Sequence, residues 1–526
     1  MILNDAISAS DSDDVERWLI GYNPMLAAGV YGRVPAGAHL DDGDPDGGVK
    51  RALALPDRLP GVQLPPLADL AAWARSAPLA AQLAAMAASL GTGHPVTRDG
   101  ELRPADAAQA AQWLGITASQ LRYLWEYALA GCWVEITHGA GDQAVAVPGE
   151  SAAGWERGEV SGASPFGVAE ASAATLRSWS VTLAVVLSGT MDIAVTLDPS
   201  GLGTLNVQGL GSLAALKLFL ARGEGGLRAS RVRDLIMNGA IGDLAWTRVR
   251  RQLDARAQSP ADPVRVLLDQ LAALRAVESS PAGEGSVRLT PLGLYALAAE
   301  LVAAGVGVPV VPPDPAMMTT ADLAALQGGV PSAEFEAVSG RWVAGHGGGQ
   351  RAAVALLNFA AGAAAADRLV AVGVVRGLGE AAAPAWREGL KRPEIRPYAR
   401  IELTRLATEL ADNTMPLVLQ PSPDDLTWLA TDLLALACGE DDPDPDMIAA
   451  QFREAVPAGD EEWIFKVMSM GSHPDVVRVL TVLGKHHPDK RVARDARKAA
   501  HEASARRAAG HRASRIHSAA PGRGHR

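Results

Sequence analysis

The chain of 526 residues carries 59 acidic and 48 basic side chains, which gives a formal net charge of −11 at pH 7. This length exceeds what one hydrophobic core usually supports and therefore predicts several domains. Hydrophobic residues make up 48% of the chain, which excludes a wholly disordered protein. Because aromatic residues reach only 5% and alanine supplies much of the apolar content, the composition favours closely packed helices over sheets.

Two cysteines, Cys132 and Cys438, are too few for a disulfide framework or a cysteine zinc site. This fits a reducing compartment. The first residues are acidic and lack the positive start of a secretory signal. The longest uncharged apolar stretch, Ala352–Ala366, is too short and too rich in alanine to cross a bilayer. We therefore expect a cytoplasmic protein with no membrane partner.

Residues 1–64 form an acidic and partly irregular N-terminal segment. The sequence pattern predicts a first module at residues 65–148. Within it, a helix opens at Pro104 and ends at Gly115, and Thr117 with Gln120 predicts a capping box for the next helix. Two short strands, 132–137 and 143–147, complete an order of helix, turn, helix and hairpin.

Residues 149–168 are rich in glycine, serine and alanine and are predicted to be a linker. A second module follows at 169–308, beginning with a bridging helix whose apolar face includes Leu176, Trp179, Leu183 and Val186. Asp262 then caps a helix that has Pro263 in its first turn, and a hairpin around 280–285 leads to a helix opened by Pro291. The same order in 79–148 and 213–303 indicates a structural duplication.

A proline-rich linker at 309–329 separates these modules from a helical region at 330–505. In that region Pro393 and Pro488 each separate two predicted helices, and an arginine follows three residues later, Arg396 and Arg491. The pattern resembles HEAT repeats, which implies an α-solenoid. Residues 506–526 are predicted to be a basic disordered tail. The expected fold is mainly α, with two winged-helix-like modules, short β-wings and a HEAT-like solenoid.

The motifs typical of catalysis are missing from this sequence. It contains no phosphate loop, no dinucleotide fingerprint and no GxSxG elbow, and Gly345–Gly349 lacks the serine elbow that an esterase would need. Asp42–Gly47 matches the first half of a calcium loop, but Leu53 stands where the bidentate acid belongs. His486 and His487 are expected at the surface. We therefore expect no enzyme activity, no cofactor and no metal site.

The sequence has features both for and against nucleic-acid binding. Both helices that would enter a major groove are close to neutral: Glu126 offsets Arg122 in the first, and Asp269 faces Arg265 and Arg275 in the second. Basic residues gather instead before the helix capped by Asp262 and near the C-terminus. The candidate phosphate contacts are Arg248, Arg250, Arg251, Arg256, Arg494, Arg497 and Lys498.

Three regions also resemble parts of one group of proteins. Residues 79–148 and 213–303, with PVTRDGELRPADA at 95–107 and VRLTPLGLYAL at 287–297, resemble the winged modules of uncharacterised actinobacterial proteins. The segment HHPDKRVARDARKAAHEA at 486–503 is similar to the last repeat of the same group. The resemblance implies a similar architecture and does not indicate an activity.

Two hypotheses follow. The first is a non-catalytic scaffold that binds a protein partner through winged-helix-like modules and a helical solenoid. The alternative is a DNA-associated regulator that contacts phosphates through the arginine cluster and the basic C-terminal segment. The near-neutral recognition helices favour the first hypothesis.

Overall fold

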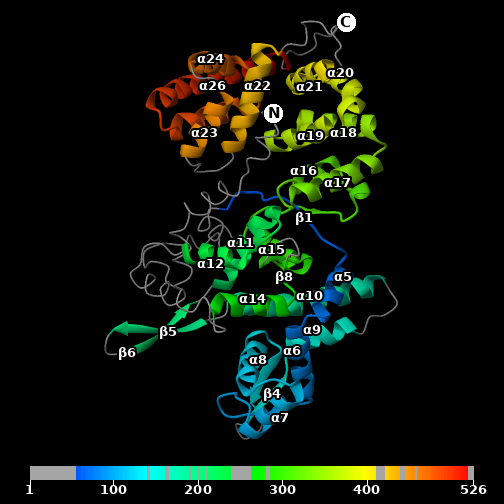
Figure 1. The fold of residues 1–526 in the computed structure, drawn as a ribbon, viewed down its shortest axis with the longest axis vertical. Coiled ribbons are helices and arrows are strands. Elements are labelled where there is room, and N and C mark those ends of the chain that lie inside the picture. The colour runs from blue at the N-terminus through cyan, green and yellow to red at the C-terminus, as the bar shows by residue number, and fades with distance from the viewer. Residues whose placement is uncertain are drawn as a thin grey trace, which may run out of the picture. The chain divides into compact units, whose positions relative to one another are not determined.

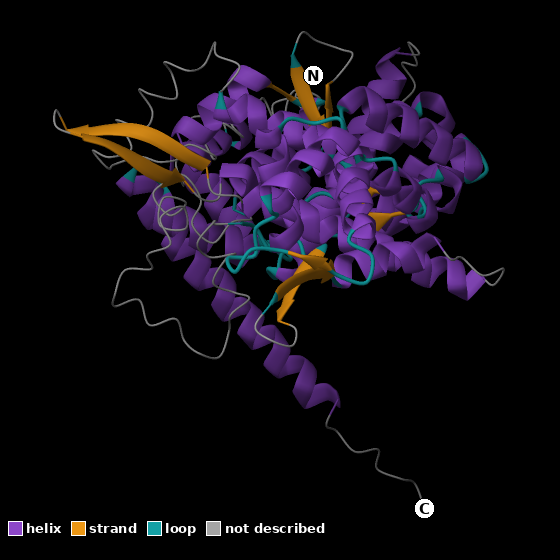
Figure 2. Ribbon diagram, turned by 90° about the horizontal axis from the view of Figure 1, so that it is seen from below, coloured by secondary structure: helices purple, strands orange, loops and turns teal. Residues whose placement is uncertain are grey.

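The computed structural model describes residues 55–138, 143–159, 165–188, 191–198, 201–207, 210–238, 262–279, 285–409, 421–438, 445–456 and 459–518. Over these ranges the protein is mainly helical, as predicted, and its strands are short (Figure 2). The chain divides into two compact units. Unit 1 comprises Met1–Pro313 with Gly328–Ser332, and unit 2 comprises Asp314–Gln327 with Ala333–Arg526.

The first module of unit 1 combines three helices with a small antiparallel sheet. Its elements in chain order are α6 (Pro78–Ser89), β2 (His94–Pro95), α7 (Pro104–Leu114), α8 (Ala118–Ala130), β3 (Val134–His138) and β4 (Ala144–Pro148). The strand β4 lies between β2 and β3, and its Ala146 pairs with His94 on one side and Ile136 on the other. The sequence pattern predicted the two helices and the hairpin but not β2.

The second module repeats this order of helices and strands. Its elements are α11 (Leu210–Leu220), η1 (Ala221–Glu224), β7 (Leu227–Arg228), α12 (Ala229–Asn238), α14 (Pro263–Ala273), β8 (Val277–Ser279), β9 (Ser286–Leu289) and α15 (Pro291–Ala303). Here β9 lies between β7 and β8. The side chain of Asp262 accepts a hydrogen bond from the backbone N–H of Val264, which confirms the predicted cap of α14.

The remaining elements of unit 1 lie outside the two modules. They are β1 (Val62–Gln63), α5 (Leu67–Arg75), α9 (Glu150–Glu159), α10 (Pro165–Ser188), the hairpin β5 (Met191–Asp198) and β6 (Gly201–Val207), and β10 (Val310–Val311), which pairs in parallel with β1. The pattern of apolar residues predicted α10, whereas the β5–β6 hairpin was not predicted.

The helix α10 holds the two modules together (Figure 1). The indole N–H of Trp133 in the first module donates to Thr182 Oγ1 on α10 at 2.7 Å. In turn, Trp179 on α10 donates to the backbone oxygen of Leu274 in the second module at 3.0 Å. A single cluster of buried apolar side chains extends from Leu55 to Val308. The two modules therefore share one hydrophobic core.

Helix α9 departs from the sequence prediction, which placed a linker at 149–168. It packs along α10, because Gly154 brings the two backbones close: a Cβ at this position would come within 2.7 Å of Ser178 Oγ. Trp155 on the same helix contacts Trp133 edge to face, with 5.3 Å between ring centroids. The small residues that are typical of a linker serve here in close helix packing.

Unit 2 is helical throughout its described residues. Its elements are η2 (Pro315–Met317), α16 (Thr320–Leu326), α17 (Ser332–Gly345), α18 (Gly349–Gly362), α19 (Ala365–Gly377), η3 (Gly379–Ala382), α20 (Ala383–Gly389), α21 (Arg396–Glu409), α22 (Pro423–Ala437), α23 (Pro445–Ala455), α24 (Glu461–Met470), α25 (Val476–His486) and α26 (Lys490–Ser518). Neighbours along the chain pack in pairs, such as α18 with α19 and α25 with α26.

The two proline turns of unit 2 lie between such helices. Pro393 separates α20 from α21, and Pro488 separates α25 from α26. The arginine after each turn contacts an acid on another helix: Arg396 lies 3.1 Å from Asp425. The corresponding distance from Arg491 to Glu461 is 3.4 Å. Both turns thus link their helix pair to a neighbouring helix through charge.

The last helix, α26, also differs from the sequence prediction. It continues to Ser518, whereas a disordered tail was expected from residue 506. The first turns of α26 bury Ala496, Ala499, Ala500 and Ala503 against unit 2. Arg506 and Arg507 extend this attachment, because they donate to the backbone oxygens of Ser469 at 2.8 Å and Pro474 at 3.0 Å. Within the described residues, no helix has the length and apolarity needed to span a membrane.

Candidate interaction surfaces

The helix pair α7–α8 of the first module is fixed by local sequence signals. Gly115 adopts a left-handed conformation that ends α7. The Thr117 side chain then accepts a hydrogen bond from the backbone N–H of Gln120, and the Gln120 side chain accepts one from the backbone N–H of Thr117, so the predicted capping box is confirmed. Trp125 anchors α8 inside the module by donating to the backbone oxygen of Gly100 at 3.0 Å.

Each helix of this pair carries an exposed aromatic side chain. Trp113 on α7 is 59% exposed, and Tyr123 on α8 is 53% exposed. The guanidinium of Arg122 lies 5.8 Å from the centre of the Tyr123 ring. Tryptophan, tyrosine and arginine are the residue types that contribute most often to protein–protein binding energy. We call Trp113, Arg122 and Tyr123 the α7–α8 face.

The corresponding helix of the second module, α14, is partly covered by its own unit. Gln270 on α14 makes a side-chain hydrogen bond to Tyr127 on α8. Burial raises the pKa of the Tyr127 hydroxyl, and the Gln270 hydrogen bond opposes this rise. On the exposed side of α14, Arg265 and Asp269 lie 3.9 Å apart and offset each other's charge. The helix therefore presents little positive charge to a phosphate backbone.

Only some of the predicted phosphate contacts fall within the described structure. Arg248, Arg250, Arg251 and Arg256 lie outside the described residues. Of the arginines that precede them, Arg233 on α12 forms a partly buried ion pair with Asp262, the cap of α14. That arginine stabilises the module internally, so it is not a free contact for nucleic acid.

The other predicted contacts lie together on α26. Arg494, Arg497 and Lys498 are all exposed, opposite the buried alanines of the helix. Arg494 pairs with Asp495 at 3.2 Å, and Arg497 donates to the backbone oxygen of Gly484 at 2.5 Å. These two guanidinium groups already have partners within unit 2, and such surface contacts weaken their attraction for a polyanion only modestly.

Unit 2 contains a buried polar cluster that was not predicted from the sequence. The carboxylate of Asp432 on α22 is fully buried and accepts hydrogen bonds from Arg368 on α19, Tyr398 on α21 and His473 before α25. The backbone N–H of Asp475 donates to His473 Nδ1 at 3.0 Å, which leaves the proton on Nε2, the atom that faces Asp432 at 2.9 Å. Trp428 lies edge-on to the same imidazole.

The groups of this cluster bind one another and stabilise the fold of unit 2. Burial alone raises the pKa of Asp432, but the hydrogen bond from His473 and the charge of Arg368 outweigh it and hold the pKa below the usual value. Both nitrogens of His473 are engaged, so neither is available to accept a proton from a substrate. The one signal in the sequence was Asp432 within the apolar second half of α22, two turns after Asp425.

The histidine and glycine motifs also have structural partners. His487 accepts a hydrogen bond from the backbone N–H of Asp489 and lies edge-on to Phe452, so it is half-buried rather than on the open surface. His346 stacks on Trp342 in the connection between α17 and α18. Across the part of the chain that the structure describes, no group of three or more histidine, cysteine or acidic side chains is arranged to hold a metal. Asp42–Gly47 lies outside those residues.

Comparisons with protein-family models, with curated proteins and with solved structures give no match.

Proposed function

We propose that this protein is a non-catalytic scaffold that binds a protein partner through the α7–α8 face. The single observation that carries the proposal is the exposure of Trp113 on α7 and of Tyr123 on α8, whose inner side buries Leu121, Leu124, Trp125 and Ala128. Rigid aromatic side chains lose little conformational entropy on binding, so they are efficient anchors for a partner. The proposal places the protein in the cytoplasm, where Cys132 and Cys438 would stay reduced.

The repeated architecture of unit 1 supports an interpretation as two winged-helix-like modules. In each module the order is helix, strand, helix, helix and hairpin, and the last strand lies in the centre of the sheet. The paired helices and proline turns of unit 2 support a HEAT-like α-solenoid. Both assemblies are used elsewhere as binding surfaces and require no catalytic site.

The charges on the two modules favour the binding of a protein over the recognition of DNA bases. The α7–α8 face carries Arg122, and Glu126 lies one turn further along the same exposed side of α8. On the second module α14 is held by Tyr127 and α10. Specific DNA recognition usually needs several cations around a helix that is free to enter a groove. Neither helix supplies them.

Removing the aromatic anchors should abolish partner binding while leaving the fold intact. We expect the double variant Trp113→Ala, Tyr123→Ala to lose at least 90% of the partner that co-purifies with the full chain, because each anchor is expected to contribute about 2 kcal/mol. Quantitative mass spectrometry of affinity-purified protein measures the loss. The matched control is Val266→Ala on the exposed side of α14. Equal recovery from the double variant and the wild type would contradict the proposal.

A second candidate function, DNA association through phosphates, is favoured by the exposed basic side of α26. We expect weak binding of duplex DNA that falls steeply with salt, and a loss of about tenfold or more when Lys490, Arg494 and Lys498 are changed to glutamine. Fluorescence anisotropy at 50 and 200 mM salt measures both effects. Substitution is preferable to truncation, because deleting α26 would expose the apolar surface that it covers. Binding unchanged by the substitutions would exclude α26 as the contact.

A further inference from the structure

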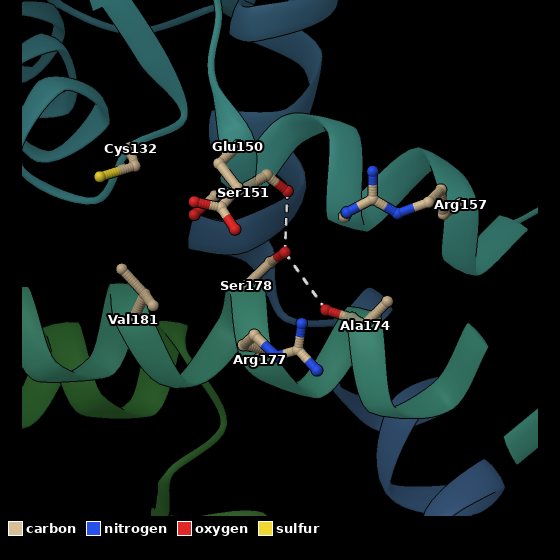
Figure 3. Close-up of a pocket in the computed structure, with 9 residues that line it drawn as sticks. Cys132, Glu150, Ser151, Arg157, Ala174, Arg177, Ser178 and Val181 are labelled. Carbon is tan, nitrogen blue, oxygen red and sulfur yellow. Dashed lines mark hydrogen bonds between the residues drawn. The ribbon is translucent and has the colours of Figure 1, made fainter. Parts of the chain in front are cut away.

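A small pocket lies between α9 and α10 in unit 1, with a volume of about 110 Å³ (Figure 3). Small residues are among those that line it. Gly154 on α9 faces Ser178 on α10, whose hydroxyl can donate either to the backbone oxygen of Ser151 at 2.8 Å or to that of Ala174 at 3.3 Å. A volume of this size holds a few water molecules or a ligand of similar size.

Charged side chains of both signs line the pocket. Arg157 comes from α9 and Arg177 from α10, while Glu150 stands at the start of α9. In Figure 3 the two guanidinium groups lie toward the side of Ala174, and the carboxylate of Glu150 lies toward the side of Cys132. Among the described residues, neither arginine lies within ion-pair distance of an acid. The positive and negative groups therefore remain available at different ends of one cavity.

A ligand that matches this arrangement carries a carboxylate and an ammonium group a few bonds apart. An arginine pair binds a carboxylate by charge-assisted hydrogen bonds, and Glu150 attracts an ammonium. A simple anion would fit less well, because Glu150 repels it. A simple amine would fit less well, because both arginines repel it. The size of the pocket restricts the ligand to few non-hydrogen atoms.

We propose that the pocket between α9 and α10 binds a small free α-amino acid, with its carboxylate on Arg157 and Arg177 and its ammonium on Glu150. The proposal is independent of the α7–α8 face. Because the charged groups are exposed to water, the dissociation constant is expected to be about 1 mM. Each arginine should contribute about tenfold to this affinity.

Saturation-transfer NMR on the full chain tests the proposal with glycine, L-alanine and L-serine as probes, and with acetate and methylammonium as single-charge controls. We expect transfer to the amino acids at millimolar concentration, and at least tenfold weaker binding of the two controls. Arg157→Gln and Arg177→Gln should each weaken amino-acid binding about tenfold. Arg103→Gln, which changes an exposed arginine outside the pocket, should have no effect.

A variant that fills the pocket and a check of the fold complete the test. Ala174→Leu places extra carbon atoms in the pocket without changing its charge, and it should also abolish binding. The circular dichroism spectrum of each variant should match the wild type. The proposal is overturned if no amino acid shows transfer at about 20 mM. It is equally overturned if acetate binds as well as alanine, or if Arg103→Gln weakens binding as much as Arg177→Gln.

Discussion

Replacing Lys217 with methionine is expected to stabilise unit 1 by about 2 kcal/mol at pH 7. Lys217 lies on α11 with only 3% of its surface exposed, and no acidic side chain among the described residues pairs with it. Burial lowers its pKa from 10.5 to about 8. That difference corresponds to an unfavourable contribution of about 3 kcal/mol when the unfolded lysine is fully charged. Methionine retains the length of the side chain without the charge.

The effect of Lys217 on the free energy of unfolding depends on pH. Below about pH 8 the lysine is protonated in both the folded and the unfolded state, so the cost of its buried charge is fully present. Between about pH 8 and 10.5 the unfolded state binds more protons than the folded state, and stability should rise with pH. Urea denaturation at pH 7 and pH 10 measures this rise, which Lys217→Met should reduce. Arg265→Met, at an exposed site on α14, is the control. A destabilised Lys217→Met variant at pH 7 would refute the argument.

The second large effect is expected at Asp432, where Asp432→Asn should destabilise unit 2 by about 3 kcal/mol. The substitution keeps the shape of the side chain but leaves the buried guanidinium of Arg368 without its counter-charge. The amide also has to satisfy donors from Tyr398 and His473 with one oxygen. Urea denaturation of unit 2 measures the loss of stability.

The exposed pair of Arg494 and Asp495 provides the matched control. Asp495→Asn removes an acid from the same unit and should change stability by less than about 0.5 kcal/mol. Adding Arg368→Met to Asp432→Asn should recover part of the loss, because it removes the unpaired charge. Equal effects of Asp432→Asn and Asp495→Asn would show that the buried cluster contributes little.

Acid should weaken the same cluster. The folded-state pKa of Asp432 lies below its ordinary value, so its contribution to stability is complete above about pH 4. The contribution is lost as the pH falls further and the carboxylate is protonated in the folded state. Burial alone raises the pKa of Asp425, but hydrogen bonds from Ser422 and Arg396 and the charge of Arg400 outweigh it and hold the pKa low. Asp425 and Asp432 on α22 therefore both stabilise unit 2 in their charged forms.

Local sequence signals predicted the parts of the fold that depend on neighbouring residues. The caps at Thr117 and Asp262 are formed as expected, because a cap needs only a side chain and the next turn of backbone. The short strands β2 and β7 have too few residues for a two-residue alternation to be visible. Helix α9 was missed because small residues are ambiguous between a linker and close helix packing.

The polar contacts of unit 2 could not be predicted, because they join distant positions. Arg368 and His473 reach Asp432 from 64 and 41 residues away along the chain. Which basic residue meets which acid depends on how α19, α21 and α22 pack, and the sequence pattern does not specify that packing. The exposure of the aromatic side chains of the α7–α8 face could not be predicted either. Trp125 is buried, whereas Trp113 and Tyr123 are exposed, and the sequence pattern could not show that these two would remain uncovered.

Site-specific photocrosslinking from position 123 most directly tests whether the α7–α8 face binds a protein. A photoreactive phenylalanine analogue replaces Tyr123 in the full chain, and a control chain carries it at Asp269 on the exposed side of α14. We predict a crosslink from position 123 to one defined polypeptide, which nuclease treatment leaves unchanged and which is absent from position 269. Crosslinks that disappear with nuclease, or that arise equally from both positions, would contradict the account.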